Sequence, residues 1–153
     1  MLTAWRIVKA KHARSAFDGE GARLFGGRWN SPGFPVVYTA ASAALATLEM
    51  LVQLGKPTVL PAYVLVSCTF DESLVTNVDR ARLPATWRSY PAPPEVQMLG
   101  NTWLRLRTSA VLQVPSDVIP SVSNFLLNPA HTGFRSIRVS SPEPLELDLR
   151  LLS

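Results

Sequence analysis

The stretch from residue 29 to residue 55 carries a single charged side chain, Glu49, and this feature restricts the possible folds more than any other. A segment so poor in charge must be covered mostly by other parts of the protein. Within it, the apolar run 42–54 predicts a helix that Ser42 caps and Gly55 ends. The sequence therefore predicts a largely buried helix with one carboxylate near its middle.

Glu49 needs either a polar partner or access to a cleft. An ionised carboxylate is rarely buried alone, because desolvation raises its pKa and neutralises it. We expect Glu49 to reach a cleft or to pair with a cation such as Arg28, which lies at the start of the same charge-poor stretch. A purely structural salt bridge explains the pattern about as well as a functional site, since ion pairs also shift carboxylate pKa values.

The composition is that of one folded domain spanning residues 1–153, with 47% hydrophobic and 17% charged residues, which excludes intrinsic disorder. The net charge is +4, but the cations are scattered rather than clustered, which argues against a dedicated nucleic-acid-binding protein. One cysteine, Cys68, and two distant histidines give no zinc ligand cluster, so no metal is expected. No segment is typical of a membrane span, so we expect a soluble, cytoplasmic protein.

Strands outnumber helices in the predicted element order. Besides the helix at 42–54, a second helix is predicted at 95–107 from apolar residues at helical spacing. β-Branched, aromatic or alternating patterns predict strands at 2–8, 35–40, 62–70, 110–114, 136–139 and 145–149. The pattern predicts a single compact α+β domain with mixed or antiparallel sheets and a few helices.

A glycine-rich segment at 19–27 holds half of the glycines and is expected to be a loop. Arg28 follows Gly26 and Gly27 directly. Backbone N–H groups in such a loop can form a concave anion site, and the guanidinium can add bidentate contacts to a phosphate. The alternative is a solvated loop arginine.

Three further side chains are candidates for a binding site. Tyr38 could stack on a planar ligand, although a half-buried strand tyrosine is the commoner case. Ser116 and Asn124 lie where apolar and small polar residues mingle, and turn or cap chemistry explains them about as well. The sequence has no nucleophile elbow, so hydrolysis by a catalytic triad has little support.

Taken together, these segments resemble the RES-domain family, which is named for an arginine, a glutamate and a serine. The family supplies the toxins of bacterial toxin–antitoxin pairs whose antitoxin is an Xre-type helix-turn-helix protein. The resemblance spans nearly the whole chain and is carried by residues 26–33, 37–40, 44–49, 100–104, 114–116 and 124–129. Asn101 stands where an acidic residue is expected, a change we take as peripheral.

The resemblance implies an ADP-ribosyltransferase-like fold that binds NAD and cleaves its nicotinamide–ribose bond by hydrolysis or phosphorolysis. It places the family's arginine, tyrosine and glutamate at Arg28, Tyr38 and Glu49. The family's serine falls on Ser116, with Ser121 and Ser123 as alternatives. The expected NAD-binding residues are Arg28, Tyr38, Ser116, Gly27, Trp29 and Asn124.

The residue chemistry agrees with this resemblance. Cleavage of the bond builds oxocarbenium character on the ribose, which the Glu49 carboxylate can stabilise. Arg28 would hold the pyrophosphate, Tyr38 would stack near nicotinamide, and Ser116 would bond the ribose or the carboxamide. The cationic nicotinamide leaves without a general acid, so the site can lack a histidine.

Two other functions remain open at this point. One is a protein ADP-ribosyltransferase that uses the same site. The other is a toxin module that acts on or binds nucleic acid, suggested only by the net charge and three tryptophans. The expected partners are NAD and a cognate Xre-type antitoxin, with DNA contacted only through that antitoxin.

Overall fold

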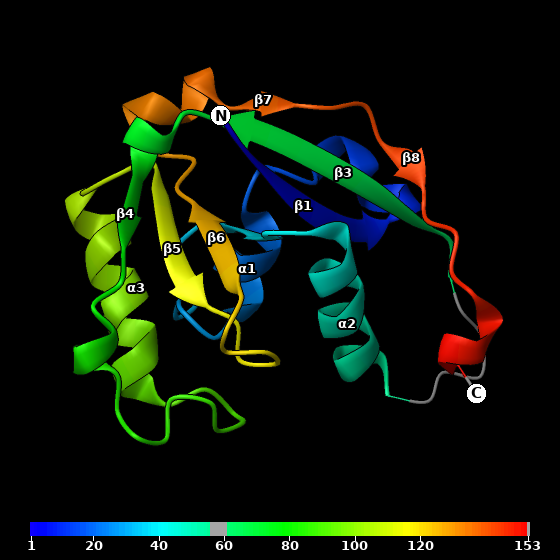
Figure 1. Cartoon of the computed structure of the whole chain (residues 1–153). Coiled ribbons are helices and arrows are strands. Elements are labelled where there is room, and N and C mark those ends of the chain that lie inside the picture. The colour runs from blue at the N-terminus through cyan, green and yellow to red at the C-terminus, as the bar shows by residue number, and fades with distance from the viewer. Residues whose placement is uncertain (56–60, 153) are drawn as a thin grey trace.

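The computed structural model describes residues 1–55 and 61–152, and its strands form one sheet (Figure 1). Along the sheet the strands follow the order β4-β5-β6-β2-β1-β3-β7, and β8 pairs with β3 beside β7. The strands are β1 (Leu2–Lys9), β2 (Val37–Ala40), β3 (Tyr63–Phe70), β4 (Val75–Asn77), β5 (Val111–Pro115), β6 (Ser123–Leu127), β7 (Arg138–Val139) and β8 (Glu143–Pro144).

The sheet is mixed and curled. The pair β4–β5 is parallel, whereas the other pairs are antiparallel, and β1 pairs with β3 along its whole length. Figure 1 shows β4, β5 and β6 running upright, while β1 and β3 run obliquely to the right of them. Residues 37–40 in β2 join the two halves, because β2 pairs with β6 on one side and β1 on the other. The predicted α+β domain is confirmed.

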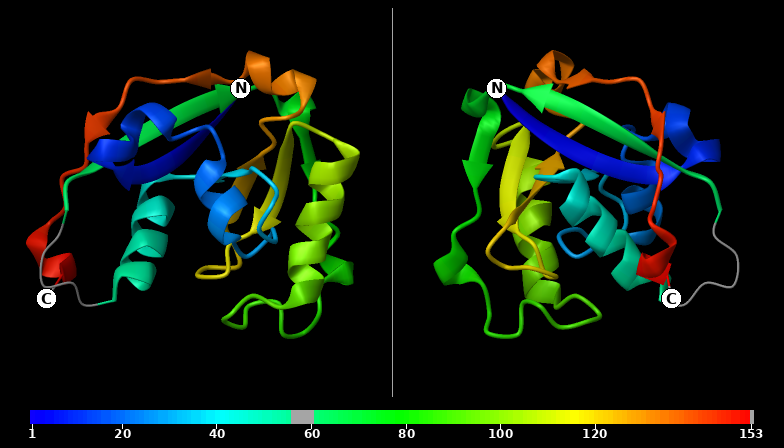
Figure 2. Two further views of the ribbon diagram at one scale, coloured as in Figure 1. Left: turned by 180° about the vertical axis from the view of Figure 1, so that it is seen from behind. Right: turned by 45° about the vertical axis from the view of Figure 1, so that its right-hand side comes forward.

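Three α-helices accompany the sheet: α1 (Glu20–Phe25), α2 (Ala43–Leu54) and α3 (Pro94–Leu106). The Ser42 hydroxyl caps α2 by accepting from the N–H of Leu45, and Gly55 follows the helix with a φ of 64°. Both predicted helices are confirmed to within about a residue. In Figure 2, α3 lies against the β4–β6 half of the sheet, and α2 lies beneath β1.

The prediction that 19–27 is a loop was wrong. Two glycines with positive φ, Gly19 (77°) and Gly26 (73°), flank the short helix α1. A Cβ on Gly19 would lie 2.7 Å from the backbone nitrogen of Val36, so this glycine allows close packing of the chain on itself. These two glycines therefore lie at the ends of a helix, although a segment so rich in glycine is typical of a loop.

The expected closing strand at 145–149 was also wrong. Its ladder ends at β8 and the bond from Leu145 N–H to the Tyr63 carbonyl, and a 3₁₀ turn forms at Leu149–Leu152. The alternating leucines face α2 and the start of β3 rather than one face of a sheet. Conversely, the sequence did not predict β4 or β6, whose segments contain many polar residues.

The core divides into two large clusters and one small one. One large cluster surrounds Phe70 and Phe125, whose rings meet edge to face. The second lies between α3 and the sheet and contains Trp29, Val36, Val96, Trp103, Leu104, Leu112, Val114 and Leu126. The small cluster, Ala40, Leu45 and Ala46, joins α2 to the sheet. Among the residues described, no helix has the length and apolar character needed to span a membrane.

Candidate active site

Glu49 accepts two hydrogen bonds from neutral side chains. Ser116 Oγ donates to its Oε2 over 2.9 Å, and Asn124 Nδ2 donates to its Oε1 over 3.0 Å. Burial raises the pKa of the Glu49 carboxyl, the two hydrogen bonds oppose this rise, and the nearby Asp117 adds to it. The structure therefore fixes both carboxylate oxygens while leaving the group only partly buried.

Ser116 is fully buried, and its hydroxyl has no bonding capacity left. It donates to Glu49 and accepts from the backbone N–H groups of Val118 and Ile119. A hydroxyl has one proton and two lone pairs, so the expected bond from Ser116 to ribose or carboxamide is not available in this arrangement. Ser116 instead orients Glu49. Ser123, one of the two alternative serines, accepts a hydrogen bond from the side chain of Gln113 instead.

Arg28 does not pair with Glu49, contrary to the salt-bridge expectation. Its Nε lies 3.0 Å from Oδ2 of Asp117, and its Nη1 donates to the carbonyls of Trp87 (2.8 Å) and Ser89 (3.0 Å). Its side chain is only 11% exposed, so the alternative of a solvated arginine is wrong too. Because the partners of Glu49 and Arg28 are the adjacent residues 116 and 117, one short loop links the two charged groups.

Tyr38 supports the segment that carries Arg28, residues 27–31 (the arginine segment), through hydrogen bonds. Its phenol oxygen accepts from the N–H of Trp29 (3.0 Å) and donates to Oδ1 of Asn30 (2.6 Å). A Cβ on Gly27 would lie 2.6 Å from that oxygen, so a glycine is required there. Burial raises the pKa of Tyr38 strongly and keeps the phenol neutral. The contacts shown are those of a positioning residue, and stacking on nicotinamide stays a prediction.

The backbone anion nest predicted around Arg28 is not formed. The N–H groups of Gly26, Gly27, Trp29 and Asn30 donate to acceptors within the protein. The indole of Trp29 is 2% exposed and packs in the core, so its side chain offers almost no surface to a ligand. Anion binding at this point would therefore depend on the guanidinium rather than on these backbone groups.

Helix α3 braces the arginine segment through residues that the sequence analysis missed. Gln97 Nε2 donates to the carbonyl oxygens of Gly27 and Asn30. Asn101 both accepts from the N–H of Ser31 and donates to its hydroxyl, so it is not peripheral. Spacing could have identified this face, because positions 97 and 101 lie one helical turn apart.

The sequence matches the model of the RES domain over residues 3–148. The chain belongs to the RES domain family. It is 37% identical over 144 residues to Toxin Res of Yersinia enterocolitica, which covers 94% of each protein. It is 33% identical over 153 aligned positions to the Prs ADP-ribosylating toxin of a Sphingobium strain, covering 97% of this chain and 95% of that protein.

Two further comparisons concern mycobacterial MbcT. The NAD(+) phosphorylase MbcT of Mycobacterium tuberculosis is 55% identical over 49 residues, which is 31% of this RES domain and 25% of that protein. The crystal structure of the M. tuberculosis MbcT–MbcA toxin–antitoxin complex matches with a TM-score of 0.73 and 24% identity, covering 94% of this chain and 84% of that chain. The second similarity establishes the fold.

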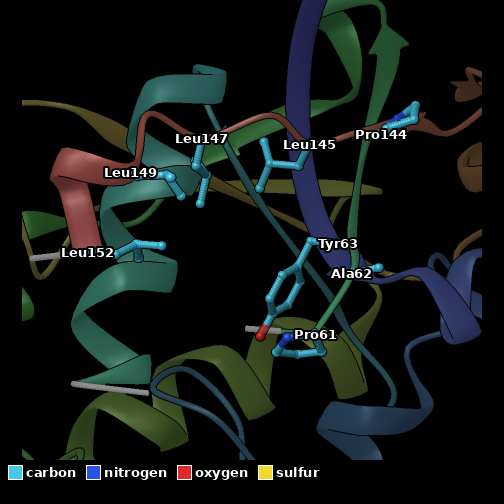
Figure 3. Close-up of a pocket in the computed structure, with 8 residues that line it drawn as sticks. All are labelled: Pro61, Ala62, Tyr63, Pro144, Leu145, Leu147, Leu149 and Leu152. Atoms are coloured by element: carbon cyan, nitrogen blue, oxygen red, sulfur yellow. The ribbon is translucent and has the colours of Figure 1, made fainter. Parts of the chain in front are cut away.

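Two hollows of this RES domain lie away from the polar network around Glu49. The first has a volume of about 290 Å³ and is lined mostly by apolar side chains (Figure 3). Its lining comes from the start of β3 and the C-terminal segment and consists of Pro61, Ala62, Tyr63, Pro144, Leu145, Leu147, Leu149 and Leu152. The second lies between α2 and residues 146–151. Neither contains a group suited to a pyrophosphate.

The metal-ligating side chains are dispersed. Within residues 1–55 and 61–152, no group of three or more His, Cys, Asp or Glu side chains is placed to hold a metal ion. Cys68 is a buried free thiol in β3, and burial raises its pKa to about 12.

Proposed function

We propose that this RES domain is the toxin of a bacterial toxin–antitoxin pair and depletes NAD by cleaving the nicotinamide–ribose bond. The observation that carries the proposal is the Glu49 carboxylate, held by Ser116 and Asn124 and linked through Asp117 to a guanidinium. The names of the relatives support it: Toxin Res over nearly the whole chain, and an NAD(+) phosphorylase over a shorter part.

Glu49 would supply the main catalytic effect. As the bond from the ribose C1′ to the nicotinamide nitrogen breaks, its electron pair goes to nicotinamide and positive charge develops on the ribose. A fixed carboxylate stabilises that charge better in the transition state than in the ground state. The hydrogen bonds from Ser116 and Asn124 restrict both oxygens, so little reorganisation is needed during the reaction. Water, which releases a proton to the solvent, or phosphate would then complete the reaction by bonding to C1′.

Asn124 is the better candidate for a direct contact to the ribose. Its amide protons go to Glu49 and to the Thr39 carbonyl, whereas its Oδ1 has no hydrogen-bond donor among the residues that the structure describes. A carbonyl oxygen next to the carboxylate suits a ribose hydroxyl, which can donate to it. The binding role predicted for Ser116 thus passes to Asn124, with Ser116 as the support of Glu49.

Arg28 would bind the pyrophosphate through its remaining nitrogen. Nε and Nη1 are engaged, and Nη2 has no partner within the described part of the chain. Guanidinium contacts to phosphate are charge-assisted and strong. Tyr38, Gly27 and Trp29 would serve the site mainly by holding this arginine in place.

A protein ADP-ribosyltransferase is the second candidate function, favoured by the Prs ADP-ribosylating relative, which matches over 97% of the chain. The same oxocarbenium chemistry serves both functions, and only the acceptor bound to C1′ differs. We also propose a cytoplasmic location and a cognate antitoxin of the Xre helix-turn-helix type, through which alone the toxin would contact DNA. The absence of a metal requirement and the domain limits 1–153 stay predictions.

The test is a product analysis with purified, antitoxin-free protein. NAD is incubated with the wild type and with Glu49→Gln, with and without phosphate and a cell extract, and the products are identified by mass. We expect free nicotinamide together with ADP-ribose, with its phosphate ester, or with ADP-ribose attached to an extract protein, and no such products from Glu49→Gln. Intact NAD under all conditions, with a control enzyme active, would overturn the proposal.

A further inference from the structure

The loop that joins β5 to β6, residues 116–122, is held by three arginines. Arg28 pairs with the Asp117 carboxylate, Arg88 donates to the carbonyls of residues 117 and 118, and Arg80 donates to the carbonyl of Pro120. Two of these contacts use only backbone oxygens, which any residue could supply. The Asp117 carboxylate is the side-chain contribution of the loop to this set of arginine contacts, and neither the motif analysis nor the family resemblance pointed to it.

We propose that Asp117 is a positioning residue of the NAD site, which holds the Arg28 guanidinium at a fixed place relative to Glu49. The inference rests on the proposed function and deepens it. Ser116 fixes the carboxylate and Asp117 fixes the arginine, so two consecutive residues set the geometry of both charged groups. A displacement of this loop would move both groups together.

The contacts of Arg28 explain why one carboxylate matters. Two carbonyls hold Nη1, but they leave the guanidinium free to turn about that nitrogen unless Nε is also held. The Asp117 carboxylate provides the second point, with its Oδ2 lying 3.0 Å from Nε. Because the Arg28 side chain is 11% exposed, water cannot fully replace a lost partner. Without Asp117, Nε would turn toward other acceptors and Nη2 would leave its place.

Asp117 also influences Glu49 through its charge, and this effect can be measured separately. Its carboxylate contributes to the raised pKa of Glu49, whose other polar neighbours are the uncharged Ser116 and Asn124. From the other elements around α2, Arg6 of β1 bonds the carbonyls of Ala16 and Tyr38, and Glu146 and Asp148 lie along the outer hollow. Removal of the Asp117 charge should lower the pKa of Glu49 and extend activity to lower pH.

Two substitutions separate position from charge. Asp117→Asn keeps a polar side chain of the same size but removes the charge that pairs with Arg28, whereas Asp117→Ala removes both the polar group and the charge. Asp148→Asn is the matched control, because Asp148 pairs with an arginine at the exposed C-terminal end and contacts neither Glu49 nor Arg28 in the described structure. All four proteins are assayed for kcat and KM for NAD across pH, with thermal unfolding as the check on folding.

We expect Asp117→Ala to raise KM for NAD about tenfold or more, since removing one partner of a largely buried ion pair leaves the other charge uncompensated. Asp117→Asn should raise KM by a smaller factor, because it keeps a polar side chain of the same size beside Arg28, and both variants should shift the acid limb of the pH profile to lower pH. A KM for Asp117→Ala within twofold of the wild type overturns the proposal, as does an equal rise in Asp148→Asn. Failure of the wild type itself to consume NAD would instead refute the proposed function. If Asp117→Ala does not fold, a KM for Asp117→Asn equal to that of the wild type overturns the proposal.

Discussion

The arginine and the glutamate of this RES domain are held in place by different means. Arg28 begins a segment whose next residue, Trp29, belongs to a large apolar cluster and is braced by α3. A Cβ on Gly100 of α3 would lie 1.7 Å from the Trp29 carbonyl oxygen, so helix and segment touch backbone to backbone. Packing of this kind leaves little room for movement.

Helix α2, which carries Glu49, is packed much more lightly. Two of its residues, Leu45 and Ala46, are buried, while Leu48 and Val52 are 40% and 64% exposed. Part of its outer face borders the hollow between α2 and residues 146–151. The position of the Glu49 carboxylate therefore depends on hydrogen bonds from residues 116 and 124 more than on packing of its helix. The comparison indicates an arginine whose segment is held by packing and a carboxylate that is held by polar contacts.

The largest effect is expected from Glu49→Gln, which removes the negative charge from the lightly packed helix α2. Loss of one preorganised electrostatic group lowers a rate about a hundredfold to a thousandfold. We expect kcat for NAD cleavage to fall by this factor while the melting temperature is no lower than that of the wild type. Steady-state kinetics and thermal unfolding measure both, with the exposed helix residue changed in Glu95→Gln as the control. Near-normal turnover would show that Glu49 is not the carboxylate that stabilises the transition state.

Gly100→Ala should disrupt the close packing between α3 and the arginine segment. The new methyl group would overlap the Trp29 carbonyl oxygen, so α3 or the arginine segment must shift. We expect the free energy of unfolding to fall by about 3 kcal/mol, at the upper end for an overpacked core. Gly21→Ala is the matched control, because no atom lies within 4 Å of its Cβ and a helical alanine is favoured by up to about 1 kcal/mol. Urea unfolding measures the free energy of unfolding of both variants. Equal values would contradict the close packing of α3 against the arginine segment.

The sequence predicted the components of the site better than their contacts. Glu49 stood out because it is the single charge in an apolar stretch, and Arg28 because it follows two glycines. Their actual partners could not be read from local patterns. Asp117 is 89 positions from Arg28 in the sequence and Ser116 is 67 from Glu49, and only the pairing of β6 with β2 and β5 brings these segments together.

The fold shows the same division between local and long-range information. Helices α2 and α3 were predictable from caps and apolar spacing, because these signals lie within the elements themselves. Strand β6 was missed since Ser123 and Asn124 make its start polar, and that polarity serves the site: Asn124 bonds Glu49. Leucines 145, 147 and 149 alternate as in a strand, yet tertiary contacts with α2 and β3 determine their conformation.

Ser116→Ala should remove a hydrogen bond that positions Glu49 while leaving the packing of α3 against the arginine segment unchanged. It removes one donor to Glu49 and leaves the N–H groups of Val118 and Ile119 without their acceptor. We expect a loss of about 1–3 kcal/mol in stability and roughly a tenfold lower kcat/KM. Because the Ser116 bond lowers the Glu49 pKa, its removal should move the acid limb to higher pH, opposite to the Asp117 variants. Ser121→Ala, at an exposed position, should change neither quantity; an unmoved acid limb in Ser116→Ala would refute the orienting role.

The smallest expected effect is the pH dependence of stability that Glu49 itself contributes. Its pKa in the folded protein is raised, chiefly by burial, so the folded state holds this proton more firmly than the unfolded state does. The stabilisation is complete below the unfolded pKa of about 4.3 and is lost as pH rises through the higher folded pKa. Glutamine cannot ionise, so Glu49→Gln should lack this decline and gain stability relative to the wild type toward neutral pH. Urea unfolding of both proteins at a series of pH values measures the difference. Parallel curves of unfolding free energy against pH would mean that the hydrogen bonds from Ser116 and Asn124 fully compensate for the desolvation of the Glu49 carboxylate.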